Sequence, residues 1–210
     1  MTGLFIVVEG VDGSGISTQI GFLRRWLSAR GLPVEATKEP SRGPFGAVIR
    51  QAIEGRLSLD DRSLALAFAA DRVDHLHNPV NGIKQHLASG RWVISDRYVL
   101  SSLAYQGAAG LDPDWLLAIN TFAIEPDVTV FIDTSPDICI QRIHQRSSSL
   151  ELYDDVEQLR KIHRLYRTWL ARGRLTGHLV TVDGSQSEDD VSRDVQNELE
   201  AWLKHRPVKT

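Results

Sequence analysis

The chain has 210 residues, of which 42% are hydrophobic and 24% are charged, with a formal net charge of −3. These values are typical of a globular protein and exclude disordered, collagen-like and low-complexity classes, and the length suits one domain over residues 1–210. Because the net charge is acidic and no long basic run occurs, the sequence also argues against a nucleic-acid-binding surface.

The first element is an apolar run, residues 4–8, which leads into glycines and then into a helical pattern. The spacing of Gly10, Gly15 and Ser17 fits the phosphate-loop motif G-x-x-x-x-G-K-[ST], in which backbone N–H groups surround phosphate oxygens and the hydroxyl holds Mg²⁺. Ile16 stands where the motif has lysine, so a plain strand-to-helix turn remains an alternative. The run is too short to span a membrane and has no basic leader, so we expect a cytoplasmic protein without signal peptide or anchor.

Predicted strands and helices then alternate along the chain. Further strands are predicted over residues 34–38, 92–95, 128–132 and 179–182, and helices over residues 44–56, 59–77, 79–89 and from 156 onward. This alternation predicts an α/β fold with a five-stranded parallel sheet whose strands are apolar on both faces. Ligands bind such sheets at the carboxyl ends of the strands, so the glycine loop, residues 38–42 and residues 96–97 should share one rim.

One pair of side chains and one carboxylate in this sequence favour nucleotide binding. Phe68 and Arg72 lie four residues apart on one helix face, where a ring can stack on a base and a guanidinium can reach its carbonyl edge. A core phenylalanine beside a solvated arginine is the structural alternative. Asp96 follows a strand and offers a carboxylate for metal-bound water, or alternatively a helix N-cap.

The single cysteine, Cys139, permits no intrachain disulfide or cysteine-based zinc site, and we expect it in the core.

Five segments together resemble the thymidylate kinase family along nearly the whole chain. They are residues 5–19, 37–40, 68–72, 92–106 and 151–153 with the helix that follows, and the block from Asp96 to Gln106 is the most specific of them. The resemblance implies a three-layer fold of the P-loop nucleoside-monophosphate-kinase type. It also implies a homodimer that uses ATP and Mg²⁺ to convert dTMP to dTDP, in dTTP synthesis.

The same resemblance implies how the acceptor nucleotide would be held. Its phosphate would be bound by three cations, Lys38, Arg50 and Arg97. Its base would be held by Phe68 through stacking and Arg72 through a carbonyl, with Ser102 and Gln106 completing the pocket. Its sugar would meet Asp12 at the 3′-hydroxyl and Tyr105, which would exclude a ribose 2′-hydroxyl.

On the donor side, the resemblance implies that ATP is bound by the loop residues Gly10, Val11, Asp12, Gly13, Ser14, Gly15, Ile16, Ser17 and Thr18. Ser17 and Asp96 would serve Mg²⁺, the latter through water. The basic stretch over about 141–152 resembles the family's lid over the ATP phosphates. Arg142 and Arg146 lie four residues apart, so both could face the donor, although a solvated helix end is an alternative for each. Side chains that act on the moving phosphoryl group would be Asp12, Arg97, Arg142 and Arg146.

The isoleucine at position 16 leaves three hypotheses of function open. In the first, the chain is a dTMP kinase in which the lid, above all Arg146 with Arg142, supplies the missing charge. In the second, it is a nucleotide-binding pseudo-kinase. In the third, it is a kinase for another deoxynucleotide or for a deoxynucleoside.

Overall fold

A computed structural model describes residues 3–146 and 156–206 of the chain. Its strands are β1 (Phe5–Glu9), β2 (Val34–Lys38), β3 (Trp92–Asp96), β4 (Val128–Asp133) and β5 (His178–Asp183). They form one sheet in the order β2-β3-β1-β4-β5, and every neighbouring pair is parallel. The predicted five-stranded parallel sheet is therefore confirmed.

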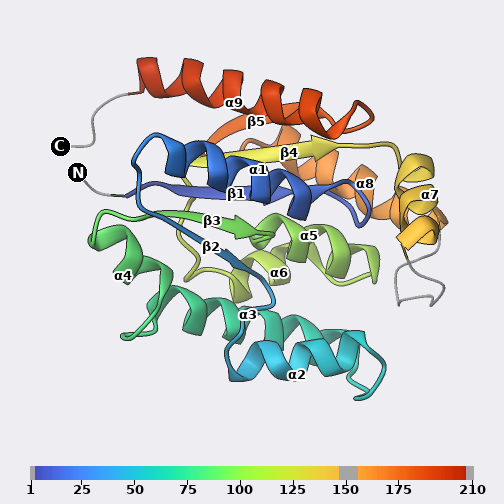
Figure 1. Cartoon of the computed structure of the whole chain (residues 1–210). Helices are drawn as coiled ribbons and strands as arrows, with labels where there is room; N and C mark the ends of the chain where they lie inside the picture. The colour runs from blue at the N-terminus through green and yellow to red at the C-terminus, as the bar shows by residue number, and fades with distance from the viewer. Residues whose placement is uncertain (1–2, 147–155, 207–210) are drawn as a thin grey trace.

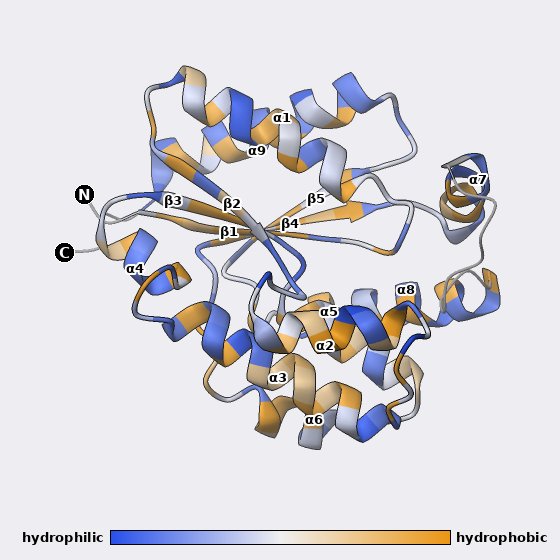
Figure 2. Cartoon of the chain, turned by 60° about the horizontal axis from the view of Figure 1, so that its bottom comes forward, coloured by the Kyte–Doolittle hydropathy of each residue, from blue (hydrophilic) through white to orange (hydrophobic). Residues whose placement is uncertain are grey.

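Helices cover both faces of this sheet and make three layers (Figure 1). The helices are α1 (Ile16–Ala29), α2 (Pro44–Ile53), α3 (Asp61–His77), α4 (Ile83–Ala88), α5 (Val99–Ala108), α6 (Pro113–Ile119), α7 (Pro136–Arg146), α8 (Val156–Ala171) and α9 (Glu188–His205). Helices α1 and α9 lie on one face, and α3, α5, α6 and α8 lie on the other (Figure 2). Apolar residues of α1 and α9 pack in the core on the first face, and those of α5 and α8 in the core on the second. None of the helices in the described residues is long and apolar enough to cross a membrane.

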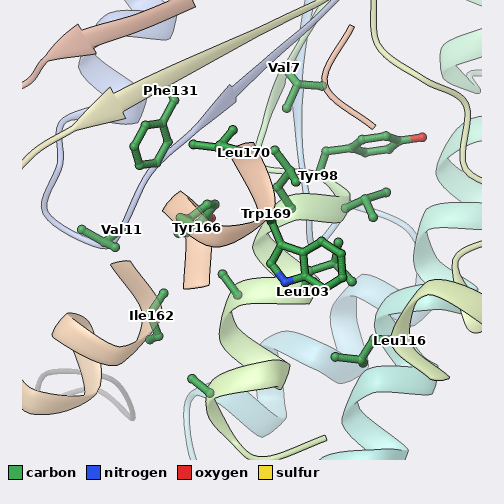
Figure 3. Close-up of a cluster of buried hydrophobic side chains, with 14 of the residues drawn as sticks. Val7, Val11, Tyr98, Leu103, Leu116, Phe131, Ile162, Tyr166, Trp169 and Leu170 are labelled. Atoms are coloured by element: carbon green, nitrogen blue, oxygen red, sulfur yellow. The ribbon is translucent and has the colours of Figure 1, made fainter. Parts of the chain in front are cut away.

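Two apolar cores result from the alternation of side chains along the central strands. On β1, Phe5 and Val7 pack with residues of α5 and α8, whereas Ile6 and Val8 pack with residues of α1 and α9. Figure 3 shows the first of these cores, in which Tyr166 and Trp169 of α8 lie beneath the sheet. Every residue of β1 is buried and β1 is the central strand, so the phosphate loop starts from a strand covered on both faces.

The edge strands depart from the prediction that every strand is apolar on both faces. Every residue of β2 is half-buried or exposed, and β5 alternates between buried and more exposed positions. Both strands lie at the edges of the sheet, where a strand has a neighbour on one side and the helical layers cover it less completely.

Some helix boundaries also differ from the sequence patterns. The pattern over 79–89 forms a helix only from Ile83 to Ala88, after a turn in which a Cβ on Gly82 would lie 2.6 Å from the carbonyl oxygen of Asn78. Helix α2 ends at Ile53, shortly before Gly55, whose φ is 70°. Helices α6 and α9 are not among the predicted elements.

Candidate functional site

The phosphate loop connects the end of β1 to the start of α1. At Gly13, φ is 80° and an added Cβ would lie 2.5 Å from the carbonyl oxygen of Cys139. At Gly15, which precedes the helix, φ is 100°, a conformation that side chains rarely adopt. The strand, glycine loop and helix required by the motif are thus present, with the helix N-terminus directed to the rim of the sheet.

Ile16 is the first residue of α1 and lies in the apolar core between that helix and the sheet. Its exposed fraction is 6%, and it belongs to the same cluster as Val8 and Ile20. Position 16 therefore contributes packing and offers neither a charge nor a hydrogen-bond donor from its side chain.

Ser17 and Asp96 bring two oxygen atoms together beside the loop. The Ser17 hydroxyl donates to Asp96 Oδ2 over 3.0 Å, although the two residues come from α1 and from the end of β3. In the described residues, no cluster of three or more His, Cys, Asp or Glu side chains has the form of a metal site. Mg²⁺ prefers oxygen ligands and usually keeps several from water and phosphate, so a hydroxyl with one carboxylate fits this ion.

Arg97 adopts an unusual backbone conformation directly after Asp96. Its φ is 68°, in the left-handed region, and its N–H donates to the carbonyl of Val8 over 3.0 Å. The side chain then reaches the phosphate loop, where Nη1 donates to Gly10 O over 2.9 Å and Nη2 to Asp12 Oδ1 over 2.5 Å. The turn at Arg97 thus delivers its guanidinium to the loop mouth.

Asp12 and Tyr105 complete this group. The Tyr105 hydroxyl donates to Asp12 Oδ2 over 2.8 Å, and the Asp12 N–H donates to that hydroxyl over 3.1 Å. The Arg97 guanidinium lies over the Tyr105 ring, with its carbon 5.0 Å from the ring centroid. Three predicted site residues from the loop, the end of β3 and α5 are therefore in contact.

Beneath them lies Glu9, a buried carboxylate that sequence reasoning missed. It accepts hydrogen bonds from the Ser101 hydroxyl over 2.6 Å, from the Tyr166 hydroxyl over 2.9 Å and from the Tyr98 N–H over 2.9 Å. Burial raises the pKa of the Glu9 carboxyl, while the Ser101 hydrogen bond and the Arg97 charge act to lower it. A charged residue at the end of an otherwise apolar buried strand was the available signal.

A narrow cavity of about 140 Å³ lies next to this group and brings the predicted base-pocket residues together. Its wall includes Phe68, Arg72, Ser102, Tyr105 and Gln106. Phe68 is half-buried, and within the described residues the buried Gln106 Oε1 has no hydrogen-bond partner.

Arg72 is buried, with 2% exposure, so the alternative of a solvated arginine is wrong. Nε and Nη2 donate to Glu39 Oε2 over 2.9 and 2.6 Å, Nη2 also donates to Ser102, and Nη1 donates to Asn120. A guanidinium has five N–H groups, so these four bonds leave one N–H on Nη1. Neither Glu39 nor Asn120 was predicted, because each becomes a neighbour of Arg72 only through the fold.

The cations predicted for the acceptor phosphate lie in different places. Lys38 lines a cavity of about 620 Å³ at the mouth of the phosphate loop. Arg50 instead donates from Nη1 to the carbonyl oxygens of Pro40 and Ser41 and lines neither this cavity nor the base pocket. Its contact with a phosphate therefore stays a prediction.

On the opposite side of the loop, Arg142 lines a third cavity, of about 340 Å³. This cavity also has Ser14, Gly15 and Thr18 on its wall, with Gly184, Gln186, Ser187 and Glu188 before and at the start of α9. Arg146 is the last residue of α7, but its side chain and the rest of the predicted lid lie outside the described residues.

Three features together define a P-loop protein of the nucleotide kinase class. These are the parallel sheet, the glycine loop between β1 and α1, and a pocket with an aromatic ring and an arginine beside that loop.

Comparison with known proteins narrows this class. The family model described as thymidylate kinase matches residues 8–195. A probable thymidylate kinase of Thermococcus gammatolerans is 40% identical over 201 residues, which cover 92% of this chain and 94% of the relative. The probable thymidylate kinase of Thermococcus onnurineus is 38% identical over 214 residues, which cover 98% of this chain and 100% of the relative. That of Pyrobaculum aerophilum is 41% identical over 192 residues, which cover 91% of this chain and 93% of the relative. The chain belongs to the thymidylate kinase family.

Proposed function

We propose that the protein transfers the γ-phosphoryl group of ATP to dTMP and gives dTDP and ADP. The observation that carries this proposal is the junction of two cavities, because Asp12 and Arg97 line both the base pocket and the mouth of the phosphate loop. A nucleotide with its base in the narrow pocket would therefore extend its phosphate toward the donor phosphates.

The base pocket favours thymine or uracil over cytosine by its pattern of donors. The Nη1 N–H that remains on Arg72 can donate to a base carbonyl, and Phe68 can stack on the ring. Thymine and uracil carry a carbonyl at the position where cytosine carries an amino group. The amino group of cytosine would face the N–H of Arg72, so two donors would meet in a buried site. This costs affinity because one polar group is left unpaired.

The sugar would lie between Asp12 and Tyr105. The Asp12 carboxylate can accept a hydrogen bond from a 3′-hydroxyl, and the Tyr105 ring would fill the space of a ribose 2′-hydroxyl. These two side chains already contact one another, so the sugar would meet a preorganised pair.

In the reaction, an oxygen of the dTMP phosphate forms a bond to the γ-phosphorus, and the bond from that phosphorus to the β,γ-bridging oxygen breaks, leaving ADP. No protein nucleophile is needed, so catalysis consists of alignment and stabilisation of charge. Arg97 would align the acceptor phosphate, together with Arg50, while loop N–H groups, Arg142 and Arg146 would hold the donor. A Mg²⁺ ion held by Ser17 and, through water, by Asp96 would neutralise phosphate charge when bound.

The proposal is tested by measuring ADP release with dTMP, dUMP, dCMP and thymidine offered in turn. We expect turnover with dTMP above all. A preference for another acceptor would identify that compound, and not dTMP, as the substrate. ATP binding without turnover on any acceptor would identify a pseudo-kinase and refute the proposal.

We also propose that two copies associate through the outer face of α2 and α3. This face carries four exposed apolar side chains: Phe45, Val48, Leu66 and Val73. Helices α2 and α3 pack against one another, so their outer sides present one surface. Sedimentation should show a dimer at micromolar concentration that Leu66→Glu dissociates, and a monomeric wild type would refute the proposal.

A further inference from the structure

The phosphate loop of this chain lacks the lysine of the motif, because position 16 is isoleucine. Ile16 lies in the core, so no conformer of this side chain brings charge to the donor phosphates. A phosphoryl group in transfer carries charge that kinases stabilise with cations. If the chain is active, another cation must lie within reach of the loop mouth.

The cavity at that mouth has few candidates. Its wall consists of residues 11–17, Lys38, Glu39, Pro40, Asp96 and Arg97. Lys38 and Arg97 are the cations on this wall in the described part of the chain. Arg97 is fixed by hydrogen bonds to Asp12, to the carbonyl of Gly10 and to the hydroxyls of Ser101 and Tyr166. Its guanidinium is therefore engaged by four groups of the protein, and it also lines the base pocket.

Lys38 differs from Arg97 in this respect. It is exposed, and no hydrogen bond or ion pair of its ammonium group occurs within the described residues. It is the last residue of β2, in register with Asp96 on β3, and Asp96 in turn accepts the hydrogen bond from Ser17. The ammonium is thus carried on a flexible four-carbon stem beside the oxygen pair that fits Mg²⁺ and beside the first turn of α1.

We propose that Lys38 replaces the missing lysine of the phosphate loop and binds the β- and γ-phosphates of the donor. This inference rests on the proposed kinase function and goes beyond the contact with the acceptor phosphate that the family resemblance implies. In this arrangement the charge enters the site from the end of β2, on the wall of the cavity that Ile16 also lines. Arg97 holds the acceptor phosphate, and Lys38 stabilises the phosphoryl group in transfer.

Lys38→Met tests the proposal, with Lys38→Arg as the variant that keeps the charge and Lys84→Met as the matched control. Lys84 is an exposed lysine of α4 that does not line the loop mouth. In Lys38→Met, kcat should fall about 10²–10³-fold, the range for a lost transition-state donor, while KM for dTMP changes little. Lys38→Arg should keep most of the activity, and Lys84→Met should resemble the wild type.

Calorimetry supplies a readout that does not depend on turnover. Lys38→Met should weaken binding of a non-hydrolysable ATP analogue about 10–100-fold, the loss expected for a charged hydrogen bond, and leave AMP binding unchanged. Adding Ile16→Lys to Lys38→Met should recover part of the analogue affinity, and thermal unfolding shows whether each variant folds.

Three results would overturn the inference. The first is a higher KM for dTMP in Lys38→Met with unchanged kcat and analogue affinity, which makes Lys38 an acceptor ligand alone. The second is no effect of Lys38→Met in an active enzyme. The third is loss of kcat in Arg142→Met but not in Lys38→Met, which assigns the role to the lid. A wild type without turnover refutes the proposed function, but the calorimetric comparison still decides the role of Lys38.

Discussion

The buried ion pair in the wall of the base pocket gives the sharpest test of the structure. Glu39 and Arg72 have side chains only 2% exposed, and Glu39 Oε2 accepts two N–H groups of the guanidinium. In Arg72→Met, the contact that remains for Glu39 in the described structure is His75 Nδ1, 3.4 Å from Oε1. A buried charge that loses its partner costs about 3–5 kcal/mol of unfolding free energy.

The double variant Glu39→Gln/Arg72→Met separates this charge effect from loss of packing. It removes the unpaired carboxylate at position 39, so its loss of unfolding free energy should be only about 1–3 kcal/mol, the cost of buried polar groups without partners. The double variant should therefore be more stable than Arg72→Met alone.

Urea unfolding followed by circular dichroism measures both variants, provided that the slope against denaturant stays constant. At about 2–4 °C per kcal/mol for a chain of this size, Arg72→Met should lower Tm by about 6–20 °C. Arg160→Met is the matched control, because Arg160 forms exposed ion pairs with Asp137 and Glu157 that contribute at most about 1 kcal/mol. If Arg72→Met is as stable as this control, or if the double variant is less stable than Arg72→Met, the reasoning is refuted.

Three further predictions concern the sugar and base contacts and the buried carboxylate. Phe68→Ala should weaken dTMP binding by about 1–3 kcal/mol without changing ATP affinity in calorimetry, and equal losses for both nucleotides would make Phe68 a purely structural residue. Tyr105→Ala should narrow the kcat/KM preference for dTMP over its ribonucleotide, and an unchanged ratio would remove Tyr105 from sugar selection. Because burial raises the pKa of Glu9 above 4.5, its contribution to stability is present below pH 4.5 and is lost as pH rises through the folded-state pKa. The wild type should therefore exceed Glu9→Gln in unfolding free energy by more at about pH 4.5 than at about pH 8, and a pH-independent difference would contradict this assignment.

The sequence predicted the sheet well because its signal is local. Each strand is a short apolar run closed by a polar residue, and the phosphate loop follows the first run at the motif's spacing. The edge positions of β2 and β5 were not predictable in this way, since strand order depends on contacts between distant segments. Helices α6 and α9 have signals that could have been used, because Asp112 and Ser187 accept N-cap hydrogen bonds from Trp115 N–H and Asp190 N–H.

For the candidate site, too, local spacing could be predicted from the sequence and contacts between distant segments could not. The pairing of Phe68 with Arg72 follows from helical spacing, and both line one cavity with Gln106, whereas their binding of a base stays a prediction. The environment of Arg72 could not be derived from spacing, because Glu39 lies 33 residues before it and Asn120 lies 48 residues after it. The prediction of a lid that supplies charge remains a prediction, since its main residue lies beyond the described side chains.

The left-handed backbone at Arg97 has a consequence for attempts to engineer this protein. A non-glycine residue in that conformation costs about 1–3 kcal/mol, and glycine adopts it without strain. Arg97→Gly would relax the backbone, but it would also delete the guanidinium that pairs with Asp12 and donates to the carbonyl of Gly10. The gain in backbone conformation is therefore offset by lost hydrogen bonds, and this position cannot be used to raise stability without removing a predicted site residue.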